Sequence, residues 1–362
     1  MQRNVLMVID SLRMGGAERI ALTLTELLLK EKISVDIITV YNNVEYRLPQ
    51  EVNVYSINYK KRYFQNTIYR HQLQKQIKAL ELKNGSPYNL VLVHLLKASR
   101  LMQYYKHQHL YFVIHNAMSS EMLNGLSASK RKHKLKRMQK KYNGKNLITV
   151  SQGVADDLLH QMHIKANSIQ LIYNPVNIQN IQTLGSCENE ADQYLPYIIH
   201  IGRFEAQKRH DILIDAYVNS TIDAKLLLVG NGSLKKTMEE KVKQLSLEDK
   251  VIFVGQHENP YPVLKKASVL ILSSDFEGLS MVILEAIALG VPVVSRDCPS
   301  GPREILEGRL DNALAPMDDL ELFASMIKQQ YENPSTISPE TLNRFDGDVV
   351  IQQYIALMDA NG

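Results

Sequence analysis

The chain alternates short apolar runs with helical segments, and it does so in two successive series. A short run that is apolar throughout predicts a strand buried on both faces of a sheet. In the first half such runs cover residues 4–10, 35–40, 89–94, 110–116 and 146–151. In the second half they cover residues 197–203, 225–232, 250–256, 268–274 and 291–297. Strands that alternate with helices predict parallel sheets covered on both sides, so the expected fold class is α/β, with two doubly wound Rossmann-like domains.

The boundary between the two series is a polar stretch without strand signal, residues 177–196, which we interpret as a linker. A length of 362 residues agrees with two domains of roughly 100–200 residues each. We expect a first domain over residues 1–178 and a second over 193–344. The last segment, 345–362, contains an amphipathic helix, and Asp346 and Asp348 before it favour a helix start over a metal site.

Composition restricts the compartment and the class of protein. The two cysteines form neither a disulfide framework nor a metal-ligand spacing, which favours a reducing environment. The first apolar run is too short for a signal-peptide core, and no run approaches the roughly 20 apolar residues that span a bilayer. We therefore expect a cytoplasmic protein without a membrane-spanning helix.

The stretch FEGLSMVILEAIALGVPVVS places one glutamate in a glycine-containing turn and a second inside an apolar helix. These are Glu277 and Glu285, and a charge buried in an apolar helix is costly unless it is paired. The backbone N–H groups of Gly278, Leu279 and Ser280, at the start of the helix, suit an anion. A carboxylate farther along the helix repels phosphate but accepts hydrogen bonds from sugar hydroxyls beside it. The pattern suits a phosphorylated sugar compound as ligand. The alternative interpretation is an ordinary pair of glutamates, because glutamates are common on helices.

Other polar or glycine residues also stand directly after predicted strands. Arg203 and Lys208 lie on one strand–helix loop, where two cations suit a diphosphate. Gly15 and Gly16 allow close approach of a ligand to the backbone, and His115 ends a buried strand as a potential acid, base or hydrogen-bond donor. The alternative interpretations are solvated surface cations, a tight turn and a structural histidine.

The chain resembles the retaining family 4 glycosyltransferases of the GT-B fold along nearly its whole length. The motifs in the family's order are GGAE, IHN, VSQGVADDL, IYNPVN, GRFEAQK, LLLVGNG, FVGQHENP and SSDFEGLSMVILEAIALGVPVVS. The Arg–Lys pair together with the two glutamates is the specific part. The resemblance implies two domains that face a central cleft and a C-terminal helix that crosses back to the first domain.

The resemblance also implies roles for the candidate residues. Arg203 and Lys208 would grip the nucleotide diphosphate, and Glu285 would bind the ribose. Glu277 would face the donor sugar and His115 would touch it near the reacting carbon, which makes these two the catalytic candidates. The other implied donor contacts are Gly15, Gly16, Gly278, Leu279 and Ser280. The family uses no divalent metal and no cofactor beyond the nucleotide-sugar donor, and it retains the configuration of the transferred sugar.

The segment SRDCPSGPREIL, residues 295–306, is similar to a block in bacterial enzymes that extend undecaprenyl-diphosphate-linked or other cell-surface glycans. It implies transfer of a hexose or N-acetylhexosamine from a UDP-sugar in lipopolysaccharide or capsule synthesis. The chain departs from the family at Ser280, where proline is frequent, and at Ala313, where glycine is frequent. The alternatives are a nucleotide-sugar epimerase of the same fold and a non-catalytic nucleotide-sugar or polyanion-binding protein, which acceptor dependence would distinguish.

The segment from Lys130 to Lys145 carries nine Lys and Arg and no acidic residue, although the net charge of the whole chain is only +4. Leu135, Met138 and Tyr142 form a narrow apolar stripe on the predicted helix. Such a helix suits the anionic inner face of a bacterial plasma membrane. The alternative is a helix that docks on its own domain by this stripe. Nucleic acid is not expected, because no stacking platform accompanies the charge.

Overall fold

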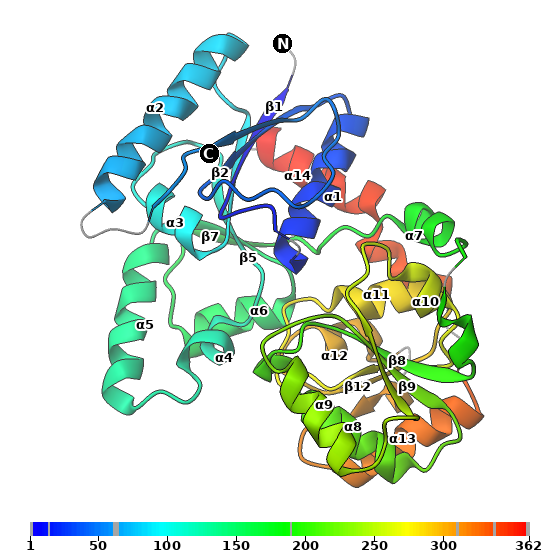
Figure 1. Cartoon of the computed structure of the whole chain (residues 1–362). Helices are drawn as coiled ribbons and strands as arrows, with labels where there is room; N and C mark the ends of the chain where they lie inside the picture. Colours follow the sequence, from blue (N-terminus) through cyan, green and yellow to red (C-terminus); the bar gives the residue numbers. More distant parts are fainter. Residues whose placement is uncertain are drawn as a thin grey trace. The chain divides into compact units, whose positions relative to one another are not determined.

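The computed structural model describes residues 3–13, 15–60, 65–188, 190–308, 311–335 and 338–359. The chain divides into two compact units, drawn in Figure 1. Unit 1 comprises Met1–Pro175 and Gly347–Gly362, and unit 2 comprises Val176–Asp346. Each unit contains one sheet of parallel strands with helices, so the predicted α/β class is confirmed.

The sheet of unit 1 has seven strands in the order β3-β2-β1-β4-β5-β6-β7. All neighbouring strands are parallel. The order reverses between β1 and β4, which is the place where doubly wound sheets bind ligands. The strands are β1 (Asn4–Ile9), β2 (Ser34–Thr39), β3 (Asn53–Ser56), β4 (Leu90–His94), β5 (Leu110–Ile114), β6 (Asn146–Thr149) and β7 (Ser168–Leu171). The helices are α1 (Gly16–Lys30), α2 (Asn66–Asn84), α3 (Leu96–Met102), α4 (Met118–Leu123), α5 (Ala128–Tyr142), α6 (Gln152–Asp156), the π-helix η1 (Asp157–Gln161) and α14 (Gly347–Asp359).

The sheet of unit 2 has six parallel strands in the order β10-β9-β8-β11-β12-β13, which reverses between β8 and β11. The strands are β8 (Tyr197–Ile201), β9 (Lys225–Val229), β10 (Val251–Gly255), β11 (Leu270–Leu272), β12 (Val293–Arg296) and β13 (Leu314–Ala315). The α-helices are α7 (Ile178–Leu184), α8 (His210–Ser220), α9 (Lys235–Gln244), α10 (Tyr261–Lys265), α11 (Met281–Ala288), α12 (Pro302–Leu306) and α13 (Leu320–Glu332). The 3-10 helices are η2 (Glu190–Tyr194), η3 (Ala206–Lys208), η4 (Asp311–Ala313) and η5 (Pro339–Phe345).

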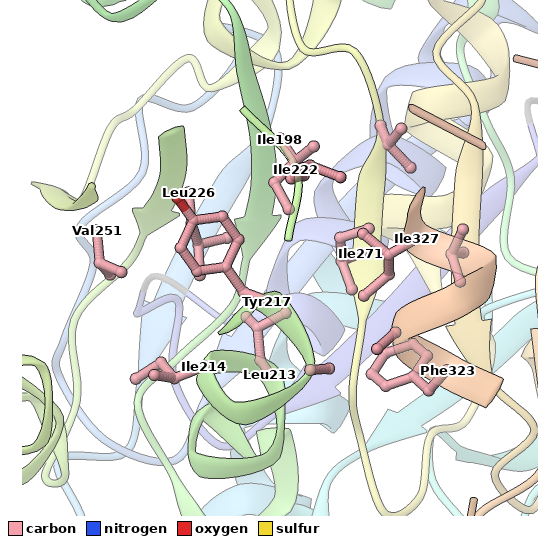
Figure 2. Close-up of a cluster of buried hydrophobic side chains, with 14 of the residues drawn as sticks. Ile198, Leu213, Ile214, Tyr217, Ile222, Leu226, Val251, Ile271, Phe323 and Ile327 are labelled. Carbon is pink, nitrogen blue, oxygen red and sulfur yellow. The ribbon is translucent and has the colours of Figure 1, made fainter. Parts of the chain in front are cut away.

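The core of unit 2 forms where helices α8 and α13 pack on one face of the sheet (Figure 2). Ile198, Leu226 and Ile271 come from three strands, and Leu213 and Phe323 come from the two helices. These side chains are almost completely buried. Burial of this kind holds the helices against the sheet and keeps the strand ends, where polar loops begin, in a constant arrangement.

The last helix, α14, belongs to unit 1 although it follows unit 2 in sequence. It packs against α1 with a buried face that includes Ile351 and Tyr354 (Figure 1). Asp348 in its first turn pairs with Lys30 of α1 at 2.8 Å. The helix begins at Gly347, so the interpretation of the aspartates around it as a helix start is confirmed.

Three strands, β3, β7 and β13, are not predicted by the apolar runs of the sequence, and each lies at an edge of its sheet. The residues of β3 and β7 are exposed or only partly buried, so these strands do not form continuous apolar runs. Strand β13 has only two residues, which is too short to give such a run. The expected linker over 177–196 is also wrong in part. It contains α7, whose Asn177 cap accepts a hydrogen bond from the Asn180 N–H at 3.0 Å, and α7 packs on α10 and α11. This helix is polar because only Ile181 on it is buried.

We expect the replacement Ile351→Ala to lower the free energy of unfolding by about 2–5 kcal/mol, because it removes buried methylene groups and leaves a cavity. Val349→Ala is the matched control on the same helix, since Val349 is 48% exposed, and it should change stability by no more than about 0.5 kcal/mol. Urea denaturation followed by circular dichroism measures both. Equal losses for the two variants would mean that α14 does not dock by the face described.

Candidate functional site

The candidate site of unit 2 lies where the strand order reverses, at the carboxyl ends of β8 and β11. The loop after β8 carries Lys208, and the loop after β11 carries Glu277. Because β8 and β11 are parallel neighbours, the two loops leave the sheet at the same edge. This explains how two residues far apart in sequence come into contact.

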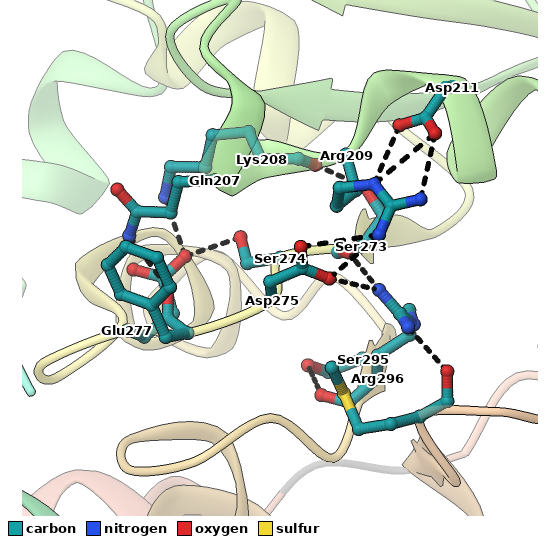
Figure 3. Close-up of polar contacts among 12 residues, drawn as sticks. Gln207, Lys208, Arg209, Asp211, Ser273, Ser274, Asp275, Glu277, Ser295 and Arg296 are labelled. Atoms are coloured by element: carbon teal, nitrogen blue, oxygen red, sulfur yellow. Dashed lines mark hydrogen bonds and ion pairs between the residues drawn. The ribbon is translucent and has the colours of Figure 1, made fainter. Parts of the chain in front are cut away.

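Lys208 and Glu277 form an ion pair in which Nζ lies 2.6 Å from Oε1 (Figure 3). Ser274 donates its hydroxyl hydrogen to the same carboxylate oxygen at 2.6 Å. The Lys208 and Glu277 side chains are only 18% and 9% exposed, so both charges are largely removed from water. A pair in this position is held strongly, because separating it would leave a buried charge without a partner.

Further hydrogen bonds tie the two loops together around the ion pair (Figure 3). The Ser273 hydroxyl donates to the Lys208 carbonyl at 2.7 Å, and the Gln207 amide donates to the Phe276 carbonyl at 2.7 Å. The Asp275 N–H donates to the Gln207 carbonyl at 2.8 Å. The position of Glu277 is therefore coupled to that of the loop that carries Lys208.

A second group of charges, which sequence reasoning missed, lies beside the first (Figure 3). Asp275 accepts a hydrogen bond from Arg209 at 3.1 Å and another from Arg296 at 3.1 Å. Arg296 is buried and also donates to the Ser273 carbonyl at 2.9 Å. Arg209 further pairs with Asp211 at 2.9 Å. The signal that could have found this group is Arg209 itself, which follows Lys208 directly.

The turn formed by Gly278, Leu279 and Ser280 leads into α11 and is covered by another loop. Leu279 and Ser280 are buried, and the Ser280 Oγ has no hydrogen-bond partner among the described residues. Gly301 has a φ of +86°, and a Cβ there would lie 3.2 Å from both the Gly278 oxygen and the Ser280 nitrogen. The Ser300 hydroxyl donates to the Glu277 carbonyl at 2.6 Å. Glycine at 301 thus permits the close approach that shapes this turn.

Glu285 is buried in α11, as the apolar helix around it predicts. Its Oε1 accepts a hydrogen bond from the Tyr261 hydroxyl at 3.2 Å, which offsets part of the cost of removing the carboxylate from water. Arg203 lies on the same loop as Lys208 but is exposed and stands outside the polar cluster. Of the candidates in unit 2, the structure therefore brings Lys208 and Glu277 into direct contact.

In unit 1, Gly15 caps α1 and Gly16 is its first residue. A Cβ at Gly15 would lie 2.4 Å from Glu18 Oε2, whereas one at Gly16 would meet nothing within 4 Å. The Tyr46 hydroxyl donates to the Gly15 carbonyl at 3.2 Å. The neighbour of Gly15 is the flexible end of the Glu18 side chain, and no atom lies close to the added Cβ at Gly16, so the backbone at the start of α1 is not enclosed at Gly16.

His115 follows β5, and its Nε2 lies 3.0 Å from Nδ1 of His94, the last residue of β4. Burial lowers the pKa of His115 to about 4. Burial, and then the charge of His115, hold the pKa of His94 well below its usual value. Both rings are therefore neutral near pH 7. Sequence reasoning did not single out His94, which reads as one more residue of a buried strand.

The basic segment forms α5, and its apolar stripe docks on unit 1. Met138 and Tyr142 are buried, and Leu135 is half-buried. Lys141 is also buried, donates to the Leu96 carbonyl at 3.2 Å, and has its pKa lowered to about 8 by burial. For the apolar stripe, the alternative interpretation is therefore the correct one: the stripe docks on the helix's own domain. The exposed cations on the helix are Lys130, Arg131, Lys132, Lys136, Arg137 and Lys140.

Among the residues that the structure describes, no group of three or more His, Cys, Asp or Glu side chains is arranged to hold a metal ion. No helix in the same part of the chain has the length and apolar character needed to cross a membrane.

Comparison with known proteins agrees with this architecture. Residues 14–180 match the family described as Glycosyltransferase Family 4, and residues 188–346 match Glycosyl transferases group 1. The chain belongs to glycosyltransferase family 4 and has the GT-B fold. The resemblance to family 4 and to the GT-B fold that the sequence motifs indicated is thereby confirmed.

Two relatives of this family 4 chain come from bacteria. The chain is 30% identical to lipopolysaccharide 1,6-galactosyltransferase of Salmonella typhimurium, over 55% of this chain and 56% of the relative. It is also 30% identical to the Campylobacter jejuni N-acetylgalactosamine-N,N'-diacetylbacillosaminyl-diphospho-undecaprenol 4-alpha-N-acetylgalactosaminyltransferase, over 52% of this chain and 51% of the relative. The chain thus spans about half the length of these curated relatives. The structure of Anabaena HepE in complex with UDP and glucose has the same fold, with a TM-score of 0.78 and 19% identity over 99% of this chain and 100% of HepE.

We expect Lys208→Met to lower the free energy of unfolding by about 3 kcal/mol, because Glu277 would remain buried without a cation. The double variant Lys208→Met/Glu277→Gln should regain most of this loss, since the charge is then absent. Lys235→Met is the control, because Lys235 and Glu239 form an exposed i,i+4 pair at 3.7 Å, worth less than about 1 kcal/mol. Urea denaturation measures all three. A double variant as unstable as the single one would contradict the coupling.

Proposed function

We propose that this protein is a retaining glycosyltransferase that transfers a hexose or N-acetylhexosamine from a UDP-sugar to a glycan or lipid-linked glycan. The observation that carries the proposal is the Lys208–Glu277 pair at the strand reversal of unit 2, beside the turn that opens α11. In a family 4 chain, this places a cation and a carboxylate together at the edge where doubly wound sheets bind ligands. The bacterial relatives named above support a role in lipopolysaccharide, capsule or related polysaccharide synthesis.

The donor is recognised in this proposal by groups of matching charge. Lys208 and Arg203 bind the diphosphate, with the backbone N–H groups of residues 278–280 at the start of α11. Glu285 and Glu277 accept hydrogen bonds from ribose and sugar hydroxyls respectively. The diphosphate competes with Glu277 for the Lys208 ammonium, so donor binding loosens the ion pair and leaves the carboxylate to the sugar.

The reaction replaces one bond at the anomeric carbon by another on the same face. The acceptor oxygen attacks from the side on which the diphosphate leaves, the bond to the β-phosphate oxygen breaks with its electron pair, and the acceptor proton passes to that oxygen. Lys208, Arg203 and the helix start stabilise the charge on the leaving diphosphate, and we propose that no divalent metal is needed. Gly15 and Gly16 of unit 1 are proposed to approach the donor phosphate, and His115 the donor sugar.

Incubation with a panel of UDP-, GDP- and ADP-sugars, with and without a lipid-diphosphate-linked acceptor extract, tests the proposal. We expect UDP release from one sugar, increased by the acceptor and unchanged by EDTA. Release stimulated by no acceptor, with conversion of the sugar, would instead identify an epimerase. Binding without turnover would identify a nucleotide-sugar-binding protein.

Glu277→Gln separates binding from chemistry in the same assay. We expect it to lose most transfer while UDP affinity, measured by calorimetry, stays within a few-fold of the unaltered chain. The amide keeps the size of the carboxylate but loses its charge. Unchanged turnover would overturn the role given to Glu277.

We further propose that the exposed cations of α5 hold the protein at an anionic membrane surface. Because Met138 and Tyr142 are buried against unit 1, this contact would be electrostatic, at roughly 1 kcal/mol for each basic residue near the lipid. A helix that inserted its apolar stripe into the bilayer would need those side chains to be free. The proposed membrane contact therefore involves only the charged face of α5.

The triple variant Lys132→Gln/Lys136→Gln/Lys140→Gln should weaken binding to phosphatidylglycerol vesicles on the order of 100-fold. The matched control removes three exposed lysines of α2, Lys75, Lys78 and Lys83, and should have a much smaller effect. Sedimentation with vesicles at low salt measures the partition. Equal effects of the two triple variants would show that binding depends on net charge and not on α5.

A further inference from the structure

The contact between His94 and His115 arises from the topology of unit 1. His94 ends β4 and His115 follows β5, and these strands are parallel neighbours with His94 opposite Val113. β4 also lies beside β1, where the strand order reverses. The two histidines therefore lie at the edge of the sheet where a doubly wound unit binds its ligand.

The short distance between the rings requires that exactly one hydrogen lies between them. His94 Nδ1 and His115 Nε2 are 3.0 Å apart, which is a hydrogen-bond distance. A neutral imidazole carries one N–H and one bare nitrogen. One ring therefore donates and the other accepts, and two arrangements are possible.

The surroundings of His94 decide between the two arrangements. His94 is completely buried, and its Nε2 has no hydrogen-bond partner among the described residues. If His115 donated, the only hydrogen of His94 would sit on Nε2 as a buried N–H without an acceptor. If His94 donates, only a lone pair on Nε2 is left without a partner. Buried donors without acceptors are the rarer and costlier case.

We propose that His94 is a positioning residue that donates from Nδ1 to His115 Nε2 and so holds His115 in the tautomer with its hydrogen on Nδ1. His115 is partly exposed, and its Nδ1 has no partner among the described residues. It therefore presents a hydrogen-bond donor, and not a base, to an oxygen of the ligand. That this ligand is the donor sugar rests on the proposed function, whereas the tautomer does not.

Nitrogen NMR of the full chain labelled with ¹⁵N-histidine tests the tautomer directly, with His115→Gln used to assign the signal. We expect a protonated-type shift for His115 Nδ1 and a bare-type shift for Nε2. In His94→Leu the ring should lose this fixed state and show a mixture of tautomers. A His115 ring with its hydrogen on Nε2 in the unaltered chain would overturn the proposal, as would an unchanged His115 spectrum in His94→Leu.

Replacement of His94 by asparagine or glutamine gives a second test, because the two amides place their nitrogen at different positions. The amide nitrogen of asparagine stands at the same place along the side chain as His Nδ1, whereas that of glutamine stands where Nε2 does. His94→Asn should therefore keep more of the transfer rate than His94→Gln or His94→Leu, which should lose roughly 10-fold in kcat, as for one hydrogen bond. Equal rates for the asparagine and glutamine variants would contradict a role that acts through Nδ1.

Thr149→Val is the matched control for the loss of a buried polar group. Thr149 ends β6, the other neighbour of β5, is completely buried, and has an Oγ1 without a partner among the described residues. We expect Thr149→Val to leave both kcat and the His115 spectrum unchanged. If Thr149→Val lowered kcat as much as His94→Leu does, the role of His94 would be purely structural. If the unaltered chain transfers no sugar, the proposed function fails, and the NMR experiment still decides the tautomer.

Discussion

The ion pair of Lys208 with Glu277 is the contact on which the candidate site of unit 2 depends. It joins the loop after β8 to the loop after β11, and these loops meet because the strand order reverses between the two strands. Each charge is largely removed from water, so each depends on the other. The contacts of Ser273, Ser274 and Gln207 then fix both loops around the pair. The cation that we propose to bind the diphosphate is thus already positioned.

The same loops are also joined by a second group of charges. Asp275 lies between Arg209 and Arg296, and Arg296 also reaches the carbonyl oxygen of Met317 beyond β13. Arg209 and Ser300 both adopt a positive φ, a conformation that non-glycine residues seldom take. The ion pairs of Arg209 and the hydrogen bond from Ser300 to the Glu277 carbonyl offset that strain. Local strain and buried charge thus occur at the same loops that carry the candidate residues.

In unit 1 the corresponding contact is a hydrogen bond between the neutral rings of His94 and His115, and not an ion pair. Burial keeps the pKa of His94 and of His115 low, so neither ring competes for a second proton near pH 7. Helix α5 combines buried and exposed groups on its two sides. Its apolar stripe and Lys141 are buried against the unit, and its other cations are left at the surface. A single helix therefore contributes both to stability and to surface charge.

The sequence by itself determined the α/β class, the central strands and most of the candidate residues, because strands buried on both faces are apolar throughout and their polar ends stand out. It also indicated the family through the Arg–Lys pair and the two glutamates. It did not show the edge strands β3, β7 and β13 or helix α7, because these short or largely exposed segments do not form continuous apolar runs. Nor did it show His94, Asp275 or Arg296. Their partners are set by which strands are neighbours, and only the tertiary structure decides that order, because hydrogen bonding between strands joins segments that are distant along the chain.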